Sequence, residues 1–343
     1  IKISRLSFVF MIVTALTSTV ISNVPTCAVY LSIASEFLKI LSGDEKRKMG
    51  KTLMIAIPVA SMIGGVITPA GSSINILAIS LLEKASGETI AFIQWTIIGI
   101  LIAAVILPIA AAIIIKVFPP INIDKNKLDG FINELDVPEK LTTDEKRVMS
   151  VFAVILVFWI SSSWVPAINI MLVAMAGCCV FCFPKFGVIS VNELVKNMSW
   201  DSFFLLGTVL SMSDVLVKNG VNDILAKAFP STVLPPVLAL CLIALMTFLF
   251  LIIIPVAPSL LVILIPIVMN IASLSNVPVT LAVMCSAVCA GNCYLFPIDT
   301  VCLLSYEKGY YRMFEMSKAT LFIQLSIVGV VPIIMCFCGM KFF

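Results

Sequence analysis

The sequence predicts an all-α protein that crosses a lipid bilayer several times, with two re-entrant helical hairpins and two discontinuous transmembrane helices arranged as inverted repeats. Three observations predict this fold class. Apolar residues make up 61% of the 343 residues and charged residues 12%, whereas soluble domains hold roughly 45–50% and 25%. Long apolar segments are interrupted by Pro, Gly and polar residues. One order of segments also occurs twice along the chain.

The same composition excludes several classes of function. The chain has no His, so imidazole catalysis and His-ligated metal sites are excluded. The net charge of +3 gives no support to nucleic-acid binding, and the bilayer is the expected partner. One close Cys cluster lies inside an apolar run, at Cys178, Cys179 and Cys182. We interpret these cysteines as small packing residues rather than as a disulfide or a metal site.

The first half of the chain predicts a hairpin, a broken helix and a plain helix. Residues 6–41 are apolar, but Ser22-Asn23-Val24-Pro25-Thr26 divides them into arms shorter than the ~20 residues of a spanning helix. We therefore predict a re-entrant hairpin with its tip at Ser22–Thr26, followed by a charged loop at 42–51. Residues 52–82 contain Gly64-Gly65 and Thr68-Pro69-Ala70-Gly71-Ser72-Ser73, which predict a discontinuous helix, and residues 90–118 predict an uninterrupted span.

The second half begins after a polar stretch. Residues 119–147 concentrate charge and predict a cytoplasmic linker. Residues 148–343 then predict a second repeat, with spans over 148–217 (148–164, 166–183 and 199–217), a hairpin at 232–276, a broken helix at 278–305 and a last span at 317–340. The hairpin is interrupted at Pro255-Val256-Ala257-Pro258-Ser259, and the helix is broken near Pro297-Ile298-Asp299-Thr300.

The hairpin, broken helix and plain helix of residues 1–118 therefore recur in the same order at 232–340. Repeats whose broken helices correspond are typical of secondary transporters that bind substrate near the bilayer midplane. Three spans precede the second copy and none precedes the first, and the chain begins with Ile1. By analogy between the halves, we expect that the N-terminal part of the first repeat is absent from this sequence.

The placement of positive charge favours re-entrant hairpins. With residues 1–5 in the cytoplasm, all of the 22 Lys and Arg residues except Lys84, Lys218, Lys227 and Lys341 lie on the cytoplasmic side. This agrees with the positive-inside rule. One straight span over 6–41 would move Lys2 and Arg5 outside and weaken the bias. We predict a multi-pass protein of the plasma membrane, or of the cytoplasmic membrane in a bacterium, with two inverted halves.

The helix breaks hold most of the residues that are able to carry chemistry. Non-helical backbone at membrane depth is tolerated only where protein buries it or where it lines a wet cavity. Unwound turns present carbonyls to cations, and helix N-termini present N–H groups to anions. Hard oxygen ligands suited to Na⁺ stand in or beside the first tip and the first broken helix, at Ser22, Asn23, Thr26, Thr68, Ser72, Ser73 and Asn75. The alternative is a set of Pro and Gly kinks whose polar side chains satisfy their own backbone.

Acidic residues inside apolar segments are a second signal, because ionisable groups in a membrane are expensive and usually functional. Asp299 lies within the last break, where two interpretations are open: it binds a cation or a proton, or it caps the following helix. Asp214 lies late in its span, where water can solvate it, and Asp201 fits an interfacial helix start.

In order and spacing, these motifs resemble the divalent anion:sodium symporter family, whose members carry dicarboxylates, citrate or sulfate. Ser22-Asn23-Val24 is similar to the Ser-Asn-Thr tip of the family's first hairpin, and residues 64–75 resemble its first loop without the double proline. Residues 200–207 and 295–311 resemble later segments of some branches. The second tip, Val256-Ala257-Pro258, departs from the pattern because it has no Ser, Asn or Thr.

The resemblance implies an Na⁺ site at Ser22, Asn23 and Gly71, with the tips contacting substrate carboxylates. On this basis the predicted cation-binding residues are Ser22, Asn23, Thr68, Gly71, Asn75 and Asp299. The predicted substrate-binding residues are Ser22, Asn23, Thr26, Ser72, Ser73 and Thr300. Asp299 is included because its charge would replace the polar groups that the second tip lacks. The resemblance further implies a homodimer, with Na⁺ or H⁺ as coupling ion and no other cofactor.

The predicted function is a secondary active transporter of small anions that works by alternating access. An arsenite or Na⁺/H⁺ antiporter-like carrier of the same superfamily is an alternative, because such carriers have tips similar to Asn23-Val24-Pro25-Thr26. A channel and a relative that has lost transport are further alternatives. A membrane-embedded aspartyl enzyme would need Asp214 and Asp299 within about 3 Å, and no spacing in the sequence predicts that. We therefore expect that the protein is not an enzyme.

Overall fold

The computed structural model describes residues 3–119 and 140–341, apart from residues 166, 185, 199 and 221–232. Over these residues the chain is helical and contains no strand. It divides into a larger unit (Ile1–Ile90, Gln94–Ile132 and Val209–Phe343) and a smaller unit (Ala91–Ile93 and Asn133–Thr208). Within the described residues, four helices are long and apolar enough to cross a membrane, at Phe92–Val117, Pro236–Ile253, Ala257–Leu274 and Met313–Lys341. The protein is thus an all-α, multi-pass membrane protein, as predicted.

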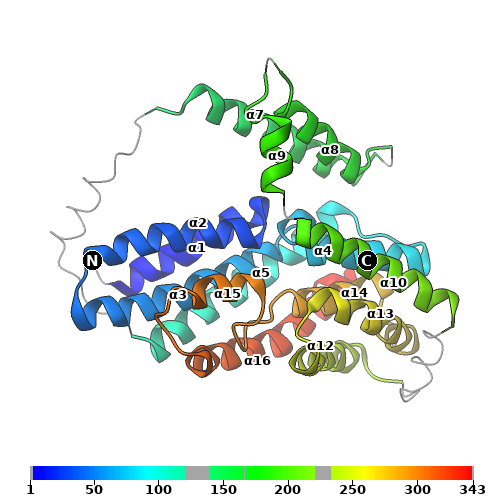
Figure 1. Cartoon of the computed structure of the whole chain (residues 1–343). Coiled ribbons are helices and arrows are strands. Elements are labelled where there is room, and N and C mark those ends of the chain that lie inside the picture. The colour runs from blue at the N-terminus through cyan, green and yellow to red at the C-terminus, as the bar shows by residue number, and fades with distance from the viewer. Residues whose placement is uncertain are drawn as a thin grey trace. The chain divides into compact units, whose positions relative to one another are not determined.

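The larger unit contains the predicted order of elements twice (Figure 1). The first copy consists of hairpin helices α1 (Ile3–Ile21) and α2 (Asn23–Lys39), the broken helix α3 (Gly43–Gly65) and α4 (Ser73–Ser86), and the plain helix α5 (Phe92–Val117). The second copy consists of α12 (Pro236–Ile253), α13 (Ala257–Leu274), α14 (Val279–Ala290), α15 (Thr300–Tyr306) and α16 (Met313–Phe337).

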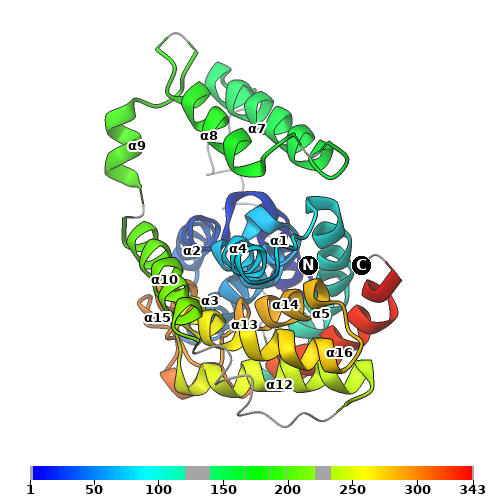
Figure 2. The ribbon, with the colours of Figure 1, turned by 90° about the vertical axis from the view of Figure 1, so that its right-hand side faces the viewer.

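The second half of each broken helix packs against the other copy. Helix α4, from the first copy, packs against α13 and α14 of the second (Figure 2). Helix α15, from the second copy, packs against α2 and α3 of the first. These contacts are reciprocal, because α2, α3 and α4 occupy the same positions in the first copy as α13, α14 and α15 do in the second. Such reciprocity is expected of an internal two-fold repeat. The orientation of the copies across a bilayer stays a prediction.

The first halves of the broken helices form the core of this unit. Helix α3 is buried on every side from Thr52 to Gly65, and α14 is buried from Thr280 to Ala290. A helix that is apolar all round is expected to be surrounded by other elements. A Cβ at Gly64 would overlap the backbone of Ala15, so α1 and α3 approach closely where α3 ends. The first hairpin therefore packs directly on the end of the helix that leads into the break.

The charged loop predicted at 42–51 is wrong, because α3 already begins at Gly43. Its first turn contains Asp44 and Glu45, whose negative charge is favourable at a helix N-terminus. Asp44 Oδ2 pairs with Lys48 Nζ, one helical turn later, at 2.7 Å. The hydrogen bond and charge of Lys48 hold the pKa of the exposed Asp44 carboxyl below its usual range. The charge run is thus spaced as a helical start rather than as a loop.

The hairpin tips and the last break also differ in extent from the prediction. The first tip is confined to Ser22, since α2 starts at Asn23, so the arms of 19 and 17 residues are longer than predicted. The second tip spans residues 254–256, between two arms of 18 residues. The last break covers residues 291–299 instead of only the stretch near Pro297, because α14 already ends at Ala290.

The smaller unit contains α7 (Thr143–Ser161), α8 (Ile170–Phe181), α9 (Val191–Asn197) and the beginning of α10 (Trp200–Lys218). The span predicted at 166–183 is wrong in length, because Asn169 Oδ1 accepts hydrogen bonds from Met171 N and Leu172 N and caps α8 there. With 12 residues α8 is about 18 Å long, too short to cross a bilayer alone. Most of the predicted linker, residues 120–139, and the start of the predicted hairpin at 232 lie outside the described residues.

Candidate functional site

The tip of the first hairpin is a strained turn of one residue. Ser22 separates α1 from α2 and has φ 78° and ψ 158°, a conformation that is essentially restricted to glycine. A side chain in this region costs on the order of 1–3 kcal/mol, which persists only where the surroundings impose it. The turn aims Asn23, the first residue of α2, into the protein, where its side chain is 6% exposed.

Asn23 joins the hairpin tip to α3 and to the first break. The end of its carboxamide that points inward lies 2.8 Å from Ser18 Oγ, 3.0 Å from the Ser61 carbonyl oxygen and 3.2 Å from the Gly71 carbonyl oxygen. When the amide nitrogen occupies this position, its two hydrogens are shared among the three oxygens, and when Oδ1 occupies it only Ser18 Oγ donates. Ser61 Oγ also donates to the backbone carbonyl of Asn23, at 2.8 Å.

Thr68 and Asn75 fix the shape of the first break, residues 66–72, which includes the 3₁₀ turn η1 (Pro69–Gly71). Thr68 Oγ1 donates to the Thr19 carbonyl at 2.6 Å and accepts from Gly71 N at 3.0 Å. Asn75 Nδ2 donates to the carbonyls of Gly65 (2.8 Å) and Thr68 (2.9 Å), and this side chain is only 1% exposed. Both predicted asparagines therefore reach the same short stretch of backbone, Asn75 at Gly65 and Asn23 at Gly71.

Glycines allow the backbone to approach this closely, and a tryptophan of α5 bonds to the break. A Cβ at Gly65 would overlap the Asn23 side chain and lie 2.9 Å from the Gly71 carbonyl oxygen. A Cβ at Gly71 would lie 2.6 Å from the Gly65 carbonyl oxygen. Trp95, fully buried on α5, donates its indole N–H to the Val66 carbonyl at 2.9 Å. The break is thus a packed structural element in which most carbonyls have assigned donors.

The structure brings four of the predicted cation residues together, Asn23, Thr68, Gly71 and Asn75, and places Ser22 next to them in the chain. Sequence reasoning missed Ser18, Ser61 and Gly65, which contact these residues directly. A Ser inside an apolar helix gives a weak signal, because its hydroxyl commonly bonds to the carbonyl four residues earlier. A buried hydroxyl pair in the second copy, Thr247 with Ser286 at 3.1 Å, resembles Ser18 with Ser61 at 3.2 Å.

The residues predicted to contact substrate are only partly brought together. Ser72 is buried and caps α4, with Oγ accepting from Ile74 N at 3.4 Å. Thr26 is buried, and its Oγ1 has no hydrogen-bond partner within the part of the chain that the structure describes. Ser73 and Thr300 are exposed, and among the described residues no contact joins either to the others. Cys27 Sγ of α2 donates to the Val301 carbonyl of α15 at 3.5 Å. Thr26 and Thr300 are the residues directly before these two partners in the chain.

Among the described residues Asp299 forms no hydrogen bond with this cluster, and it lies beside the second tip. Its Oδ1 accepts from Val301 N at 2.9 Å, so it caps α15, as one of the two interpretations predicts. It also lines a small cavity of about 20 Å³ together with Pro255 of the second tip and Ile298. No ion pair engages its carboxylate within residues 3–119 and 140–341 as described. Asp299 thus combines a capping role with a position at the second tip.

Asp214 adds nothing to either cluster. Asp214 pairs with Lys84 at 2.9 Å, and both side chains are exposed, which agrees with a solvated Asp214. With Asp214 in that pair and Asp299 capping α15, no observation supports an aspartyl catalytic dyad. The side chain of Asp201 is outside the described part of the chain.

Comparison with known proteins gives a family and several relatives. The family model described as "Citrate transporter" (CitMHS) matches residues 2–291. An uncharacterized transporter of Haemophilus influenzae is 27% identical over 232 residues, which cover 63% of this chain and 47% of the relative. An uncharacterized transporter of Methanocaldococcus jannaschii is 24% identical over 210 residues, 60% of this chain and 45% of the relative. A membrane protein of Cupriavidus necator is 22% identical over 186 residues, 54% of this chain and 36% of the relative. The chain therefore spans less than half the length of these relatives.

Proposed function

The chain belongs to the citrate transporter family, and from this premise we propose that it forms part of a secondary carrier of small carboxylate anions, driven by Na⁺ and working by alternating access. The family and the names of the relatives indicate a membrane transporter rather than an enzyme. The substrate, the coupling ion and the mechanism are the proposal. We also propose the plasma membrane, or the cytoplasmic membrane of a bacterium, as its location and a homodimer as its assembly.

One observation carries the proposal of a cation site. Three oxygens, Ser18 Oγ and the carbonyl oxygens of Ser61 and Gly71, lie within 3.2 Å of the inward end of the Asn23 carboxamide. Oxygens of this type, from unwound backbone and from the C-terminal ends of half-helices, are the ligands that transporters use for Na⁺. The end of α3 also directs the negative end of its dipole toward the break. The arrangement thus offers a cation partial negative charge without any ionised side chain.

The Asn23 carboxamide provides a physical link between ion and hairpin. In the absence of a cation, its nitrogen donates to the three oxygens and holds the tip against the break. A cation at this position would compete for the same oxygens and would favour the orientation with Oδ1 inward. Binding would thereby replace the hydrogen bonds between the tip and the break with bonds to the cation. It would also place positive charge next to Ser22 and Thr26. We propose that these two residues contact the substrate carboxylate, as do Ser72, Ser73 and Thr300.

In the second copy, we propose that Asp299 performs the electrostatic role that the apolar tip Val256-Ala257-Pro258 does not. The carboxylate lies beside that tip and is not paired with a cationic side chain in the described residues. Asp299→Asn retains the oxygen that caps α15 and removes only the charge. In reconstituted vesicles this variant should therefore stay folded but lose most of the cation dependence of uptake. Cation dependence equal to that of the unmodified protein would reject this role.

The experiment that tests the proposed function is uptake by the full-length protein in proteoliposomes. Radiolabelled citrate, succinate and sulfate are offered under an inward Na⁺ gradient or with choline in its place. We expect Na⁺-dependent uptake of at least one carboxylate, with counterflow, and loss of the Na⁺ dependence in Asn23→Ala. Asn219→Ala is the matched control, because Asn219 is exposed directly after α10 and its Nδ2 donates to the Val215 carbonyl of that helix.

The alternatives give different results in the same experiment. A channel would show flux without stimulation by substrate on the opposite side, and a relative that has lost transport would show no flux. An antiporter-like carrier of arsenite or of Na⁺ and H⁺, suggested by the tip Asn23-Val24-Pro25-Thr26, would move these ions without any carboxylate. Each of these outcomes would overturn the proposal of a carboxylate carrier.

A further inference from the structure

A second concentration of functional groups lies at the opposite end of α3 from the break. A cavity of about 350 Å³ is lined by two segments that are distant in sequence: Gly43, Lys46, Arg47 and Lys51 from the start of α3, and Gly309, Tyr310, Tyr311, Arg312 and Glu315 from the α15–α16 connection and the start of α16. Lys51 and Gly65 are 14 residues apart on one helix, which separates the cavity from the candidate cation site by about 21 Å.

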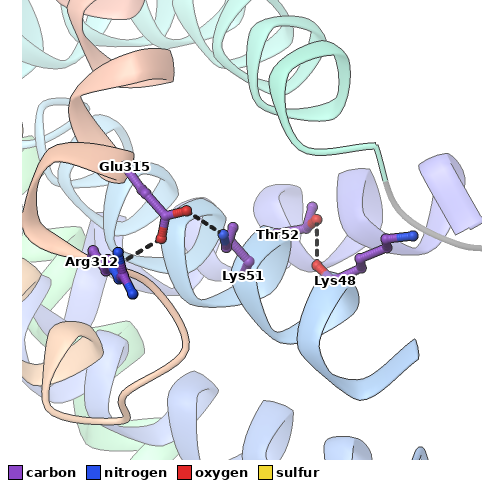
Figure 3. Close-up of polar contacts among 5 residues, drawn as sticks. All are labelled: Lys48, Lys51, Thr52, Arg312 and Glu315. Carbon is purple, nitrogen blue, oxygen red and sulfur yellow. Dashed lines mark hydrogen bonds and ion pairs between the residues drawn. The ribbon is translucent and has the colours of Figure 1, made fainter. Parts of the chain in front are cut away.

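The wall of this cavity is held in place by tight contacts. Tyr310 packs on Gly50, where a Cβ would overlap its aromatic ring. The buried Tyr311 hydroxyl lies 2.6 Å from Ser305 Oγ. Lys51 Nζ pairs with Glu315 Oε1 at 2.6 Å, and Glu315 Oε2 accepts from the backbone N–H of Arg312 at 2.8 Å (Figure 3). The connection between α15 and α16 is therefore fixed against the first turns of α3.

The lining has a surplus of positive charge. Four of its side chains are cationic, and its one carboxylate, Glu315, is already engaged by Lys51 and by the Arg312 backbone. Within the described residues, Lys46, Arg47 and Arg312 form no ion pair. Nearby Asp44 is paired with Lys48 at 2.7 Å. Bringing unpaired cations together around one cavity is unfavourable unless an anion joins them.

The surroundings of the cavity indicate where that anion comes from. The positive-inside pattern predicts that Lys46, Arg47, Lys51 and Arg312 lie on the cytoplasmic side. On the first turn of α16, directly after Arg312, Met313 and Phe314 are exposed, Phe314 by 71%. Cationic side chains around a cavity with exposed apolar side chains beside it match the two ends of a phospholipid, with phosphate at the cations and acyl chains along the apolar surface.

We propose that this cavity binds the phosphate headgroup of an anionic phospholipid from the cytoplasmic leaflet. The lipid phosphate would accept hydrogen bonds from Arg47 and Arg312, with Lys46 adding charge, while Lys51 and Glu315 keep the two walls together. Because the walls belong to α3 of the first copy and α16 of the second, the bound lipid would join the two copies at this end. This inference does not depend on which substrate is carried or on its coupling ion.

Charge that only orients the protein in the membrane would give a different structure. Such residues act through their number and side, and they need no cavity and no fixed partner segment. Here segments about 260 residues apart contribute cations to one cavity, as Lys51 and Glu315 show by their ion pair. A test must therefore compare the same loss of charge inside and outside the cavity.

The test measures the unfolding temperature of the full-length protein in micelles of neutral phosphatidylcholine to which phosphatidylglycerol is added. The cavity variant is Arg47→Gln with Arg312→Gln. The control is Lys39→Gln with Lys116→Gln, which removes equal charge from the same predicted side but outside the lining. We expect phosphatidylglycerol to raise the unfolding temperature, and its apparent affinity to fall on the order of tenfold in the cavity variant only.

Three results would overturn the inference. Phosphatidylglycerol without effect on the unfolding temperature would show that the cavity binds no anionic lipid. Equal weakening in the cavity and control variants would show that general surface charge, rather than this cavity, attracts the lipid. Full stabilisation by inorganic phosphate in neutral micelles, with no further gain from phosphatidylglycerol, would assign the cavity to a soluble anion.

Discussion

Replacing Gly65 by alanine tests the geometry of the first break most severely. The added Cβ would overlap the Asn23 side chain, with Asn23 Cγ at 2.8 Å, and would lie 2.9 Å from the Gly71 carbonyl oxygen. Both are shorter than the roughly 3.5–4.0 Å at which non-bonded carbon atoms pack. Asn23 must therefore leave its position, and it loses its contacts with Ser18, Ser61 and Gly71.

The size of the effect follows from these contacts. Each lost hydrogen bond costs about 1 kcal/mol, and the strain of an added methyl group in a packed interior costs about 1–3 kcal/mol. The higher helix propensity of alanine returns at most about 1 kcal/mol. The sum is a loss of about 3–5 kcal/mol in the free energy of unfolding. Because the displaced Asn23 no longer offers Oδ1 to the cation, the Na⁺ concentration for half-maximal uptake should rise by about tenfold, which corresponds to about 1.4 kcal/mol.

The assay is Na⁺-dependent uptake in proteoliposomes, with the unfolding temperature measured on the same preparations. Gly329→Ala is the matched control, because Gly329 lies inside α16 and its Cβ would meet no atom within 4 Å. Adding Asn23→Ala to Gly65→Ala should raise the unfolding temperature only in part, since it removes the overlapping side chain but not the close approach to the Gly71 carbonyl or the loss of hydrogen bonds. It should not restore the Na⁺ response. An unchanged Na⁺ response in Gly65→Ala, together with normal folding, would refute the reasoning.

Three further changes test other parts of the account. Asn75→Ala removes the donor to the Gly65 carbonyl and one of the two donors to the Thr68 carbonyl, which keeps Gly71 N, and should cost about 1–3 kcal/mol in the free energy of unfolding, measured by chemical denaturation. Trp95→Phe removes the indole bond to the Val66 carbonyl and part of a fully buried ring. It should lower the free energy of unfolding by about 1–3 kcal/mol, measured in the same way. Hydrogen bonds from Thr142, first from its backbone N–H and then from its hydroxyl, hold the pKa of Glu145 below its usual value. The contribution of this cap to the stability of α7 is therefore present at pH values above the usual pKa of Glu145, and it is lost as the pH falls through the lowered pKa. Thr142→Val should move the pKa of Glu145 upward in an NMR titration.

The sequence was sufficient to find the breaks but not their extent. Ser22, Thr68 and Pro69 interrupt long apolar runs. At membrane depth, polar residues and proline in such a run predict that the helix is interrupted there. Residues 44–48 do not form the predicted loop, because Asp44 and Lys48 are spaced one helical turn apart and pair within α3. The break after Ala290 was placed too late, because Gly291 and Asn292 are weaker signals than Pro297.

The contacts that make the candidate site required the tertiary structure. Asn23 and Asn75 were identified from the chain, but the meeting of Asn23 with Gly71 and Ser61 depends on how the hairpin packs on α3. The packing of α4 and α15 against the opposite copy also required the structure, because the pattern of apolar residues does not show which copy a half-helix contacts. The sequence also did not predict the basic cavity, because its walls come from segments that are far apart in the chain, as the pair of Lys51 and Glu315 shows.

The most direct measurement of the proposed cation site uses Trp95, whose indole bonds to the break at Val66. Trp159, Trp164, Trp200 and any tryptophan of the full-length protein outside this sequence are replaced by Phe. The fluorescence of Trp95 is then followed while Na⁺ is titrated against choline at constant ionic strength. The account predicts a saturable change with Na⁺ that Asn23→Ala abolishes and Asn219→Ala leaves intact. A fluorescence signal that does not respond to Na⁺, or that responds equally in Asn23→Ala, would contradict a cation site at this break.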